Sequence, residues 1–161
     1  MKNLSKQFQR IVDNSTLDDL KILGDFLENF EKKQQGEFNT YLSASLNMQR
    51  ETDEHSSAVR IPNTPFIHNN IDIPHGGILA VLLDTAMGTL ASSKCPEGFV
   101  AVTTNITIHY LTVAVEDEIR ADARMIRQGA HTMVVEGNIV QQDGKHIATA
   151  TGSFFIVPKR Q

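Results

Sequence analysis

A run of apolar and small residues between positions 78 and 92 contains a single charged residue, Asp84. An amphipathic surface helix would carry a polar stripe, but here large apolar side chains would point in all directions around a helix: Leu79, Val81, Leu82, Leu83, Ala86, Met87 and Leu90. Such a helix is expected to be buried on most sides. A carboxylate in these surroundings loses hydration, which proteins tolerate when the group has a partner or a task. Asp84 is therefore a candidate functional residue; the alternative is an Asp that reaches a gap in the packing or a backbone N–H.

The length and composition exclude several classes of protein. The 161 residues suit one domain with a substantial core, and the net charge of −4 disfavours nonspecific binding of nucleic acid. The single Cys95 excludes a disulfide framework and favours a reducing compartment. The first residues lack the apolar core of a signal peptide, and the longest uninterrupted apolar run, at residues 78–83, is too short to cross a bilayer. We expect a cytoplasmic, soluble protein that binds neither nucleic acid nor membranes.

The first third of the chain has helical periodicity. Residues 15–18 are typical of a helix start, Gly36 of a helix end, and apolar residues recur between them at helical spacing: Leu17, Leu20, Leu23, Leu27 and Phe30. A shorter amphipathic segment at residues 4–12 precedes them. We expect a helical extension over residues 1–36 that packs on the main domain or on a partner subunit. The main domain then spans residues 37–161.

From residue 41 the periodicity changes to that of strands. Alternation of apolar and polar residues at 42–48 predicts one strand, and residues 58–61 predict a second. Four segments rich in Val, Ile, Thr and Phe follow the apolar helix, at residues 100–110, 118–127, 131–141 and 146–157. Asp143-Gly144 predicts a two-residue hairpin turn between the last two. This order predicts an α+β fold in which an antiparallel sheet wraps around a long central helix.

The segment directly before the apolar helix suits a binding site. Pro74 fixes the chain ahead of the helix, and Gly76 and Gly77 allow a ligand to approach the backbone closely. The first N–H groups of a helix lack internal acceptors and lie at the positive end of its dipole. They suit negative charge, including the charge that develops on a carbonyl oxygen during acyl transfer. The alternative is that the two glycines only let the helix pack tightly against the sheet.

Several motif residues taken together resemble the PaaI-like acyl-CoA thioesterases of the hot-dog fold. The set comprises Asn69, His75-Gly76-Gly77, Asp84 on the following helix and Thr103 on the next strand. The resemblance covers roughly residues 38–157, including the segments at 105–111, 127–131 and 152–155.

The chain departs from the family pattern at two positions. Asp72 stands where the family usually has Gly, in the loop before His75, and Val113 stands where a Pro often follows the Tyr-Leu pair. The first departure concerns the geometry of the loop, and the second concerns a strand end.

The resemblance implies a role for each motif residue. The amide of Gly76 would hold the thioester oxygen. Asn69 would orient the nucleophilic water or the thioester, and His75 would support that geometry. Asp84 would act as general base or as the attacking carboxylate, and Thr103 would position the water. Contacts with coenzyme A or the acyl substrate are expected at four further residues, the last two in a loop that borders the coenzyme A channel in the family: Gly77, Val102, Arg127 and Gly129.

Helix geometry gives an argument about assembly that does not depend on the family. Gly76 and Asp84 are eight residues apart, which corresponds to about 12 Å along a straight helix. A base and an oxyanion donor serve one carbonyl from distances of about 3 Å. If both act on one substrate, Asp84 must come from a neighbouring chain, so the active unit is at least a homodimer. The resemblance implies obligate dimers, often paired into tetramers, with sites at the subunit interface.

Other chemistries receive less support from the sequence. The six His residues show no HxxxH or HxH spacing, and a single Cys adds nothing, so no metal site is expected. Ser153 lacks the Gly-x-Ser-x-Gly elbow of serine hydrolases, and Cys95 is interpreted as structural. We therefore expect an acyl-CoA thioesterase without a metal or redox cofactor, whose acyl preference stays open. The alternatives are a non-catalytic acyl-CoA-binding sensor or regulator and, with less support, an interaction scaffold.

Overall fold

The computed structural model describes residues 3–159. The chain divides into two compact units, residues 1–47 and 48–161, and each is described by itself. The domain boundary predicted after residue 36 stays a prediction.

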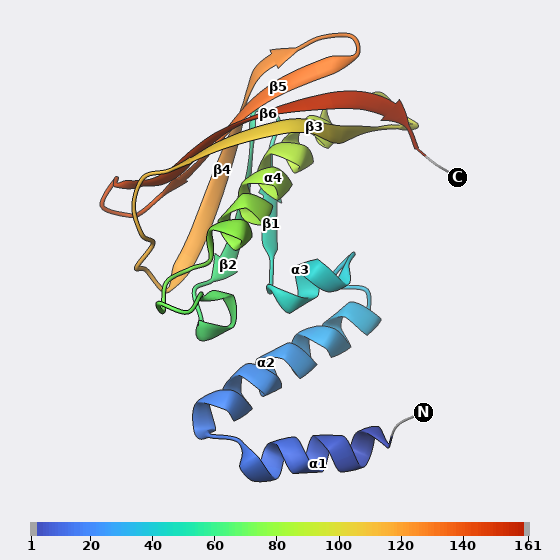
Figure 1. Cartoon of the computed structure of the whole chain (residues 1–161). Helices are drawn as coiled ribbons and strands as arrows, with labels where there is room; N and C mark the ends of the chain where they lie inside the picture. Colours follow the sequence, from blue (N-terminus) through green and yellow to red (C-terminus); the bar gives the residue numbers. More distant parts are fainter. Residues whose placement is uncertain (1–2, 160–161) are drawn as a thin grey trace. The chain divides into compact units, whose positions relative to one another are not determined.

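The first unit is helical, as expected. It consists of α1 (Leu4–Asn14), α2 (Leu17–Gln34) and the short α3 (Tyr41–Ser45) (Figure 1). The predicted strand at residues 42–48 is wrong, because α3 occupies most of that segment and the first strand starts at Gln49. The Oγ1 atom of Thr40 accepts a hydrogen bond from the Ser43 N–H at 3.1 Å and so caps the first turn of α3.

Both ends of α2 have capping motifs formed by neighbouring residues of the chain. At the start, the Oγ1 of Thr16 accepts from the Asp19 N–H at 3.2 Å, while Asp19 Oδ2 accepts from the Thr16 N–H at 2.9 Å. This reciprocal pair is a capping box. At the end, Gly36 has a φ of +89°, and the Glu37 N–H donates to the Lys32 carbonyl at 3.0 Å. These features form a Schellman motif, which explains why the helix stops where the sequence predicts.

The second unit is a six-stranded antiparallel sheet with one long helix, α4 (Gly76–Ser93), packed along it (Figure 1). The sheet order is β1-β2-β4-β5-β6-β3. The strands are β1 (Gln49–Thr52), β2 (Ser56–Pro62), β3 (Phe99–Tyr110), β4 (Glu118–Gln128), β5 (Thr132–Val140) and β6 (His146–Pro158). A short 3-10 helix, η1 (Pro65–Ile67), interrupts the loop between β2 and α4. The expected α+β fold, with an antiparallel sheet around a central helix, is confirmed.

The connection between β5 and β6 differs from its prediction. The Gln141 N–H donates to the Lys145 carbonyl at 3.0 Å, which leaves three residues in the loop instead of two. The Gly144 N–H returns to the Gln141 carbonyl at 2.9 Å, and Gly144 alone takes a positive φ, of +82°. Asp143 keeps a negative φ. A turn followed by one left-handed glycine is the usual solution for a three-residue hairpin loop.

In the single chain, α4 is buried on one side only. Its buried residues are Leu79, Leu82, Leu83, Ala86, Met87, Leu90 and Ala91. The other side, which includes Val81, Asp84 and Thr85, is only half-buried, so the expected burial on most sides holds for the sheet-facing side alone. The helix is long and apolar enough to cross a membrane, with a mean hydropathy of 1.3 over 18 residues. Its packing against all six strands of the sheet accounts for much of that apolar character.

Two glycines on the inner face of the sheet let α4 approach closely. A Cβ atom added at Gly152 on β6 would lie 2.9 Å from the Phe154 ring and 3.3 Å from Met87 Cε. One added at Gly137 on β5 would lie 3.1 Å from Leu83 Cδ2. The separation between helix and sheet therefore depends on the absence of side chains at these positions.

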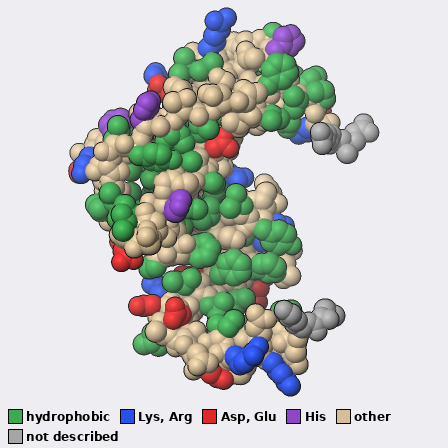
Figure 2. Space-filling model, in the orientation of Figure 1, with side chains coloured by type: hydrophobic (Ala, Val, Ile, Leu, Met, Phe, Trp, Pro, Cys, Tyr) green, Lys and Arg blue, Asp and Glu red, His purple; other side chains and the backbone are tan. Residues whose placement is uncertain are grey.

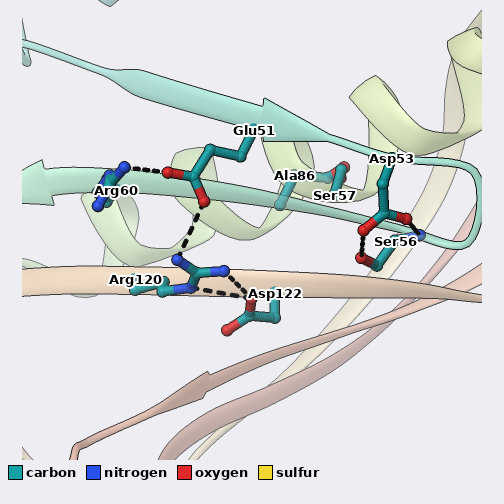
Figure 3. A network of polar contacts seen from close by, with 8 residues as sticks. All are labelled: Glu51, Asp53, Ser56, Ser57, Arg60, Ala86, Arg120 and Asp122. Carbon is teal, nitrogen blue, oxygen red and sulfur yellow. Dashed lines mark hydrogen bonds and ion pairs between the residues drawn. The ribbon is translucent and has the colours of Figure 1, made fainter.

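Opposite faces of β2 carry different polar contacts (Figure 3). On the outer face, Glu51 accepts hydrogen bonds from Arg60 and from Arg120, both partly exposed, so these ion pairs add little stability. On the inner face, the buried Ser57 donates from its Oγ to the Ala86 carbonyl at 2.5 Å. This bond fastens the middle of α4 to the sheet.

Replacing Gly152 by Val is expected to lower the free energy of unfolding by about 1–3 kcal/mol, because the added methyl groups overlap the Phe154 ring and Met87. Urea unfolding at one fixed protein concentration measures the change. Thr151→Val is the control, since Thr151 is the exposed neighbour on the other face of β6, where substitutions usually change stability by about 0.5 kcal/mol or less. Equal stability of Gly152→Val and the parent would show that the helix does not need this space.

Candidate active site

The start of α4 is built by a histidine and two glycines. His75 is the N-cap, and its Nδ1 accepts a hydrogen bond from the Gly77 N–H at 2.9 Å. The His75 N–H donates to the Ile67 carbonyl at 2.9 Å, which ties the cap to η1. The N–H of Gly76 is the first of the helix and has no acceptor in the helical ladder. The position that the sequence proposes for an oxyanion donor is therefore a free helix-start amide.

Asn69 stabilises the loop that leads to this cap. Its N–H donates to the Ile73 carbonyl at 2.9 Å, and its Oδ1 accepts from the Ile71 N–H at 3.0 Å. Because the side-chain oxygen is used within the loop, the amide offers a ligand its N–H donors. Asp72 has a φ of +55°, a conformation that Gly adopts freely and Asp tolerates better than most residues. The departure from the family pattern at Asp72 thus leaves the loop with a glycine-like backbone.

Asp84 has a partner on the neighbouring strand. Thr103 donates from its Oγ1 to Asp84 Oδ1 at 2.8 Å. Asp84 is half-buried and Thr103 exposed, so the pair lies at the surface of the single chain. The register of β3 against β6 shifts between Thr103 and Asn105. Irregularities of this kind re-aim side chains, and this one lies beside the contact with the acid.

A second contact between β3 and α4 joins the last residue of the strand to the first residue of the helix, whereas Asp84 and Thr103 lie near the middle of their elements. Tyr110, the last residue of β3, donates from its hydroxyl to the Gly76 carbonyl at 2.8 Å. With Thr103 beside Asp84, this contact shows that β3 and α4 run in opposite directions along each other. Sequence reasoning gave Tyr110 no role. It lies in the segment at 105–111 that the family resemblance covers, and its hydroxyl becomes informative once this alignment is known.

The structure therefore groups the predicted catalytic residues into two sets. Asp84 and Thr103 form one set, and the loop and cap residues Asn69, His75 and Gly76 form the other. The helical distance of about 12 Å between Gly76 and Asp84 separates the sets within one chain.

Three of the four residues predicted to contact coenzyme A lie at one end of the sheet. Val102 is 47% exposed and pairs with Phe155, which also pairs with Thr132. The Gly129 N–H donates to the Thr132 carbonyl at 2.8 Å, and the exposed Arg127 lies at the end of β4 beside this turn. This is the end of β3 that carries Thr103. The fourth predicted residue, in the first turn of α4, lies near the opposite end.

Two other residues weighed in the sequence have ordinary surroundings. Burial raises the pKa of the Cys95 thiol, and its Sγ donates to the Ala91 carbonyl at 3.5 Å. The backbone carbonyl of Ser153 accepts from Thr104 Oγ1 at 3.0 Å within the sheet. In the part of the chain that the structure describes, no three His, Cys, Asp or Glu side chains form a group suited to a metal ion.

Comparisons with known proteins identify the family. The model of the thioesterase superfamily matches residues 73–148, which contain α4, β3, β4 and β5. The BH2602 protein of Bacillus halodurans, whose crystal structure contains CoA, is 31% identical. The match covers 95% of this chain and 99% of that one, with a TM-score of 0.88. This chain belongs to the thioesterase superfamily. Among curated proteins none matches the sequence.

Two further solved structures resemble this chain. The PaaI protein of Escherichia coli, from the phenylacetic acid degradation operon, is 25% identical over 83% of this chain and 96% of its own, with a TM-score of 0.68. A Haemophilus influenzae thioesterase, HI1161, is 19% identical over 80% and 90% of the two chains, with a TM-score of 0.71, and shows the fold alone. The predicted PaaI-like family and hot-dog fold are confirmed.

Replacing His75 by Ala is expected to lower the free energy of unfolding by about 0.5–2 kcal/mol, because the Gly77 N–H loses its acceptor. His75→Asn keeps a capping oxygen and is expected to retain most of that stability. Urea unfolding of both variants at equal protein concentration measures the difference. Identical losses in the Ala and Asn variants would mean that the cap contributes nothing.

Proposed function

We propose that this protein hydrolyses acyl-CoA thioesters to a carboxylic acid and free coenzyme A, at a site formed between two subunits. The observation that carries the proposal is the hydrogen bond from Thr103 to Asp84 on the side of α4 that the sheet leaves open. A fixed carboxylate at an open helix side is suited to act on a bound thioester. Membership of the thioesterase superfamily and the CoA-containing relative support this substrate class.

Asp84 supplies the base in this proposal. Thr103 holds Oδ1, so Oδ2 is the oxygen that takes a proton from a water molecule as that water attacks the thioester carbon. The carbonyl oxygen becomes negative, and collapse of the intermediate breaks the carbon–sulfur bond and releases the thiolate, which is then protonated. In the alternative course, the Asp84 carboxylate attacks the thioester carbon and displaces the coenzyme A thiolate, and water then hydrolyses the resulting mixed anhydride to the carboxylic acid and free Asp84.

The start of α4 supplies the oxyanion donor. The Gly76 N–H has no acceptor in the helical ladder and lies at the positive end of the helix dipole, so it stabilises the negative oxygen. The amide of Asn69 donates to the water or to the thioester, and His75 holds the first turn in place through Gly77. No metal or redox group takes part in these steps.

The free edge of the sheet supports a dimer. β3 is the last strand in the sheet order and 12 residues long, and within residues 3–159 it pairs with β6 alone. Apolar side chains reach the surface of this unit (Figure 2), among them Val102 and Tyr110 on β3, which are 47% and 52% exposed. A long, unpaired edge strand invites a second strand. A second copy of this chain, added through its own β3, would cover it.

Such a pairing would also join the two sets of site residues. Antiparallel strands related by a two-fold axis place the half of one β3 that contains Thr103 beside the half of the other that ends at Tyr110. Thr103 is hydrogen-bonded to Asp84, and Tyr110 is hydrogen-bonded to Gly76. The acid of one chain would therefore face the helix start of its partner. Pairing of such dimers into tetramers is part of the proposal.

The end of the sheet with Val102, Arg127 and Gly129 is the proposed place for coenzyme A. The guanidinium of Arg127 is exposed there and suits a phosphate. We propose a cytoplasmic location, where acyl-CoA is the available thioester.

Replacing Asp84 by Ala is expected to lower the rate of thiol release from acyl-CoA by about 10²- to 10⁴-fold, the range for loss of a positioned base. A thiol-detecting assay over acyl-CoA substrates of different acyl size measures the rate and the acyl preference together. Asn69→Ala keeps the base and is expected to lose less. Asp122→Ala removes an exposed acid from the outer face of β4 and is the matched control with unchanged rate.

An Asp84→Ala variant that releases thiol as fast as the parent contradicts the proposal. A parent that binds acyl-CoA without releasing thiol supports the sensor instead.

Replacing Gly76 by Pro removes the proposed oxyanion donor while leaving the helix start intact. Pro is favoured at the first helical position, and His75, with φ −66° and ψ 127°, has the extended backbone that precedes Pro. The turnover number is expected to fall by about 10²- to 10³-fold. Gly76→Ala keeps the N–H, and its Cβ would lie 3.4 Å from the Tyr110 ring, an ordinary contact, so it is the matched control.

A mixed dimer tests whether the site is shared. One chain carries Asp84→Ala and the other Gly76→Pro, and two affinity tags isolate the mixed species. If the acid acts with the partner's helix start, one of two sites is intact, and about half of the parent activity returns. No recovery would place both groups in one chain.

A further inference from the structure

Tyr110 makes a contact that the proposed chemistry does not yet use. Its hydroxyl donates to the Gly76 carbonyl at 2.8 Å. Its ring covers the same residue, because a Cβ added at Gly76 would lie 3.4 Å from Tyr110 Cζ and 3.6 Å from Cε1. The residue whose N–H is the proposed oxyanion donor is thus held by one side chain from β3.

The start of α4 needs such support because two consecutive glycines form its first turn. Glycine has the largest backbone freedom, so a helix that begins with Gly76-Gly77 is prone to fray at that turn. The N-cap bond of His75 fixes Gly77 and leaves Gly76 without a side-chain tether of its own. The bond from Tyr110 supplies that tether at the carbonyl of Gly76.

We propose that Tyr110 is a positioning residue that holds the Gly76 amide in line with the developing oxyanion; this inference rests on the proposed function. An amide that stabilises charge must be oriented before the charge appears, since reorientation during the reaction would weaken it. In the shared site argued above, Tyr110 and Gly76 of one chain act on the thioester that the partner's acid attacks. β3 then contributes to both halves of the site, through Thr103 near its middle and Tyr110 at its end.

This role predicts which kinetic parameter changes. The ground-state carbonyl is almost neutral, and the amide acts mainly on the negative transition state. Loosening the amide therefore lowers kcat and leaves KM nearly unchanged. Tyr110→Phe removes only the hydroxyl and keeps the ring against Gly76.

The experiment measures thiol release by Tyr110→Phe, with kcat and KM determined separately. We expect kcat to fall about tenfold, the size of effect that a small misplacement of a catalytic group produces. Tyr41→Phe is the matched control, because it is the other tyrosine of the chain and lies on α3 of the helical unit. Unfolding curves of both variants establish that equal amounts of folded protein are compared.

A double variant separates positioning from general destabilisation. If Tyr110 acts through the Gly76 amide, adding Tyr110→Phe to Gly76→Pro lowers kcat no further, because the amide is already gone. The inference is overturned if the losses in kcat of the two single variants multiply in the double variant, or if Tyr110→Phe alone leaves kcat unchanged. Neither result affects the proposed activity of the parent. A parent that releases no thiol overturns the proposed function, and this inference with it.

Discussion

The hydrogen bond from Thr103 to Asp84 is the contact on which the other features of this molecule depend. It joins the acid of α4 to β3, the edge strand of the sheet. The Thr103 hydroxyl satisfies one of the two carboxylate oxygens, and the half-buried position keeps Asp84 partly hydrated. The carboxylate is therefore tolerated on an apolar helix without a cation. It also lies on the helix side that the sheet does not cover, where a ligand or a second chain can reach it.

Patterns in the sequence predict the long elements and fail for short ones. The helical periodicity of α2 extends over 18 residues and the β-prone segments of β3 to β6 over 9 to 13 residues, so one interpretation prevails for each. At residues 42–48 the same alternation spans too few residues, and Leu42 and Leu46 are also spaced four apart, as in a helix. The N-cap hydrogen bond of Thr40 stabilises the helical alternative, α3. The loop between β5 and β6 is likewise decided by one backbone bond, from Gln141 to Lys145, that residue types do not reveal.

Site residues that stand out within their own sequence segment could be predicted. Contacts that depend on how a helix and a strand are aligned could not. Asp84 is conspicuous as the single charge in an apolar run, and the two glycines mark the helix start. The pairing of Asp84 with Thr103 required the family resemblance, because the two residues lie 19 positions apart. The resemblance also covers Tyr110, within the segment at 105–111, but it gave no contact for this residue. Its contact with Gly76 exists only because β3 and α4 run antiparallel with this register, which no local pattern contains.

Assembly and chemistry are linked in the proposed dimer through the same strand. β3 leaves one edge unpaired, and α4 leaves its acid-bearing side half-buried, so the single chain exposes apolar surface in two adjacent places. One two-fold contact would cover both and, because the helix and strand are antiparallel, would bring each Asp84 to the other chain's Gly76. A site divided in this manner makes activity dependent on association. The base and the oxyanion donor lie about 12 Å apart on the same helix, which keeps them at that distance. Only a second chain can then bring an acid and a helix-start amide together at one thioester, which favours the dimer.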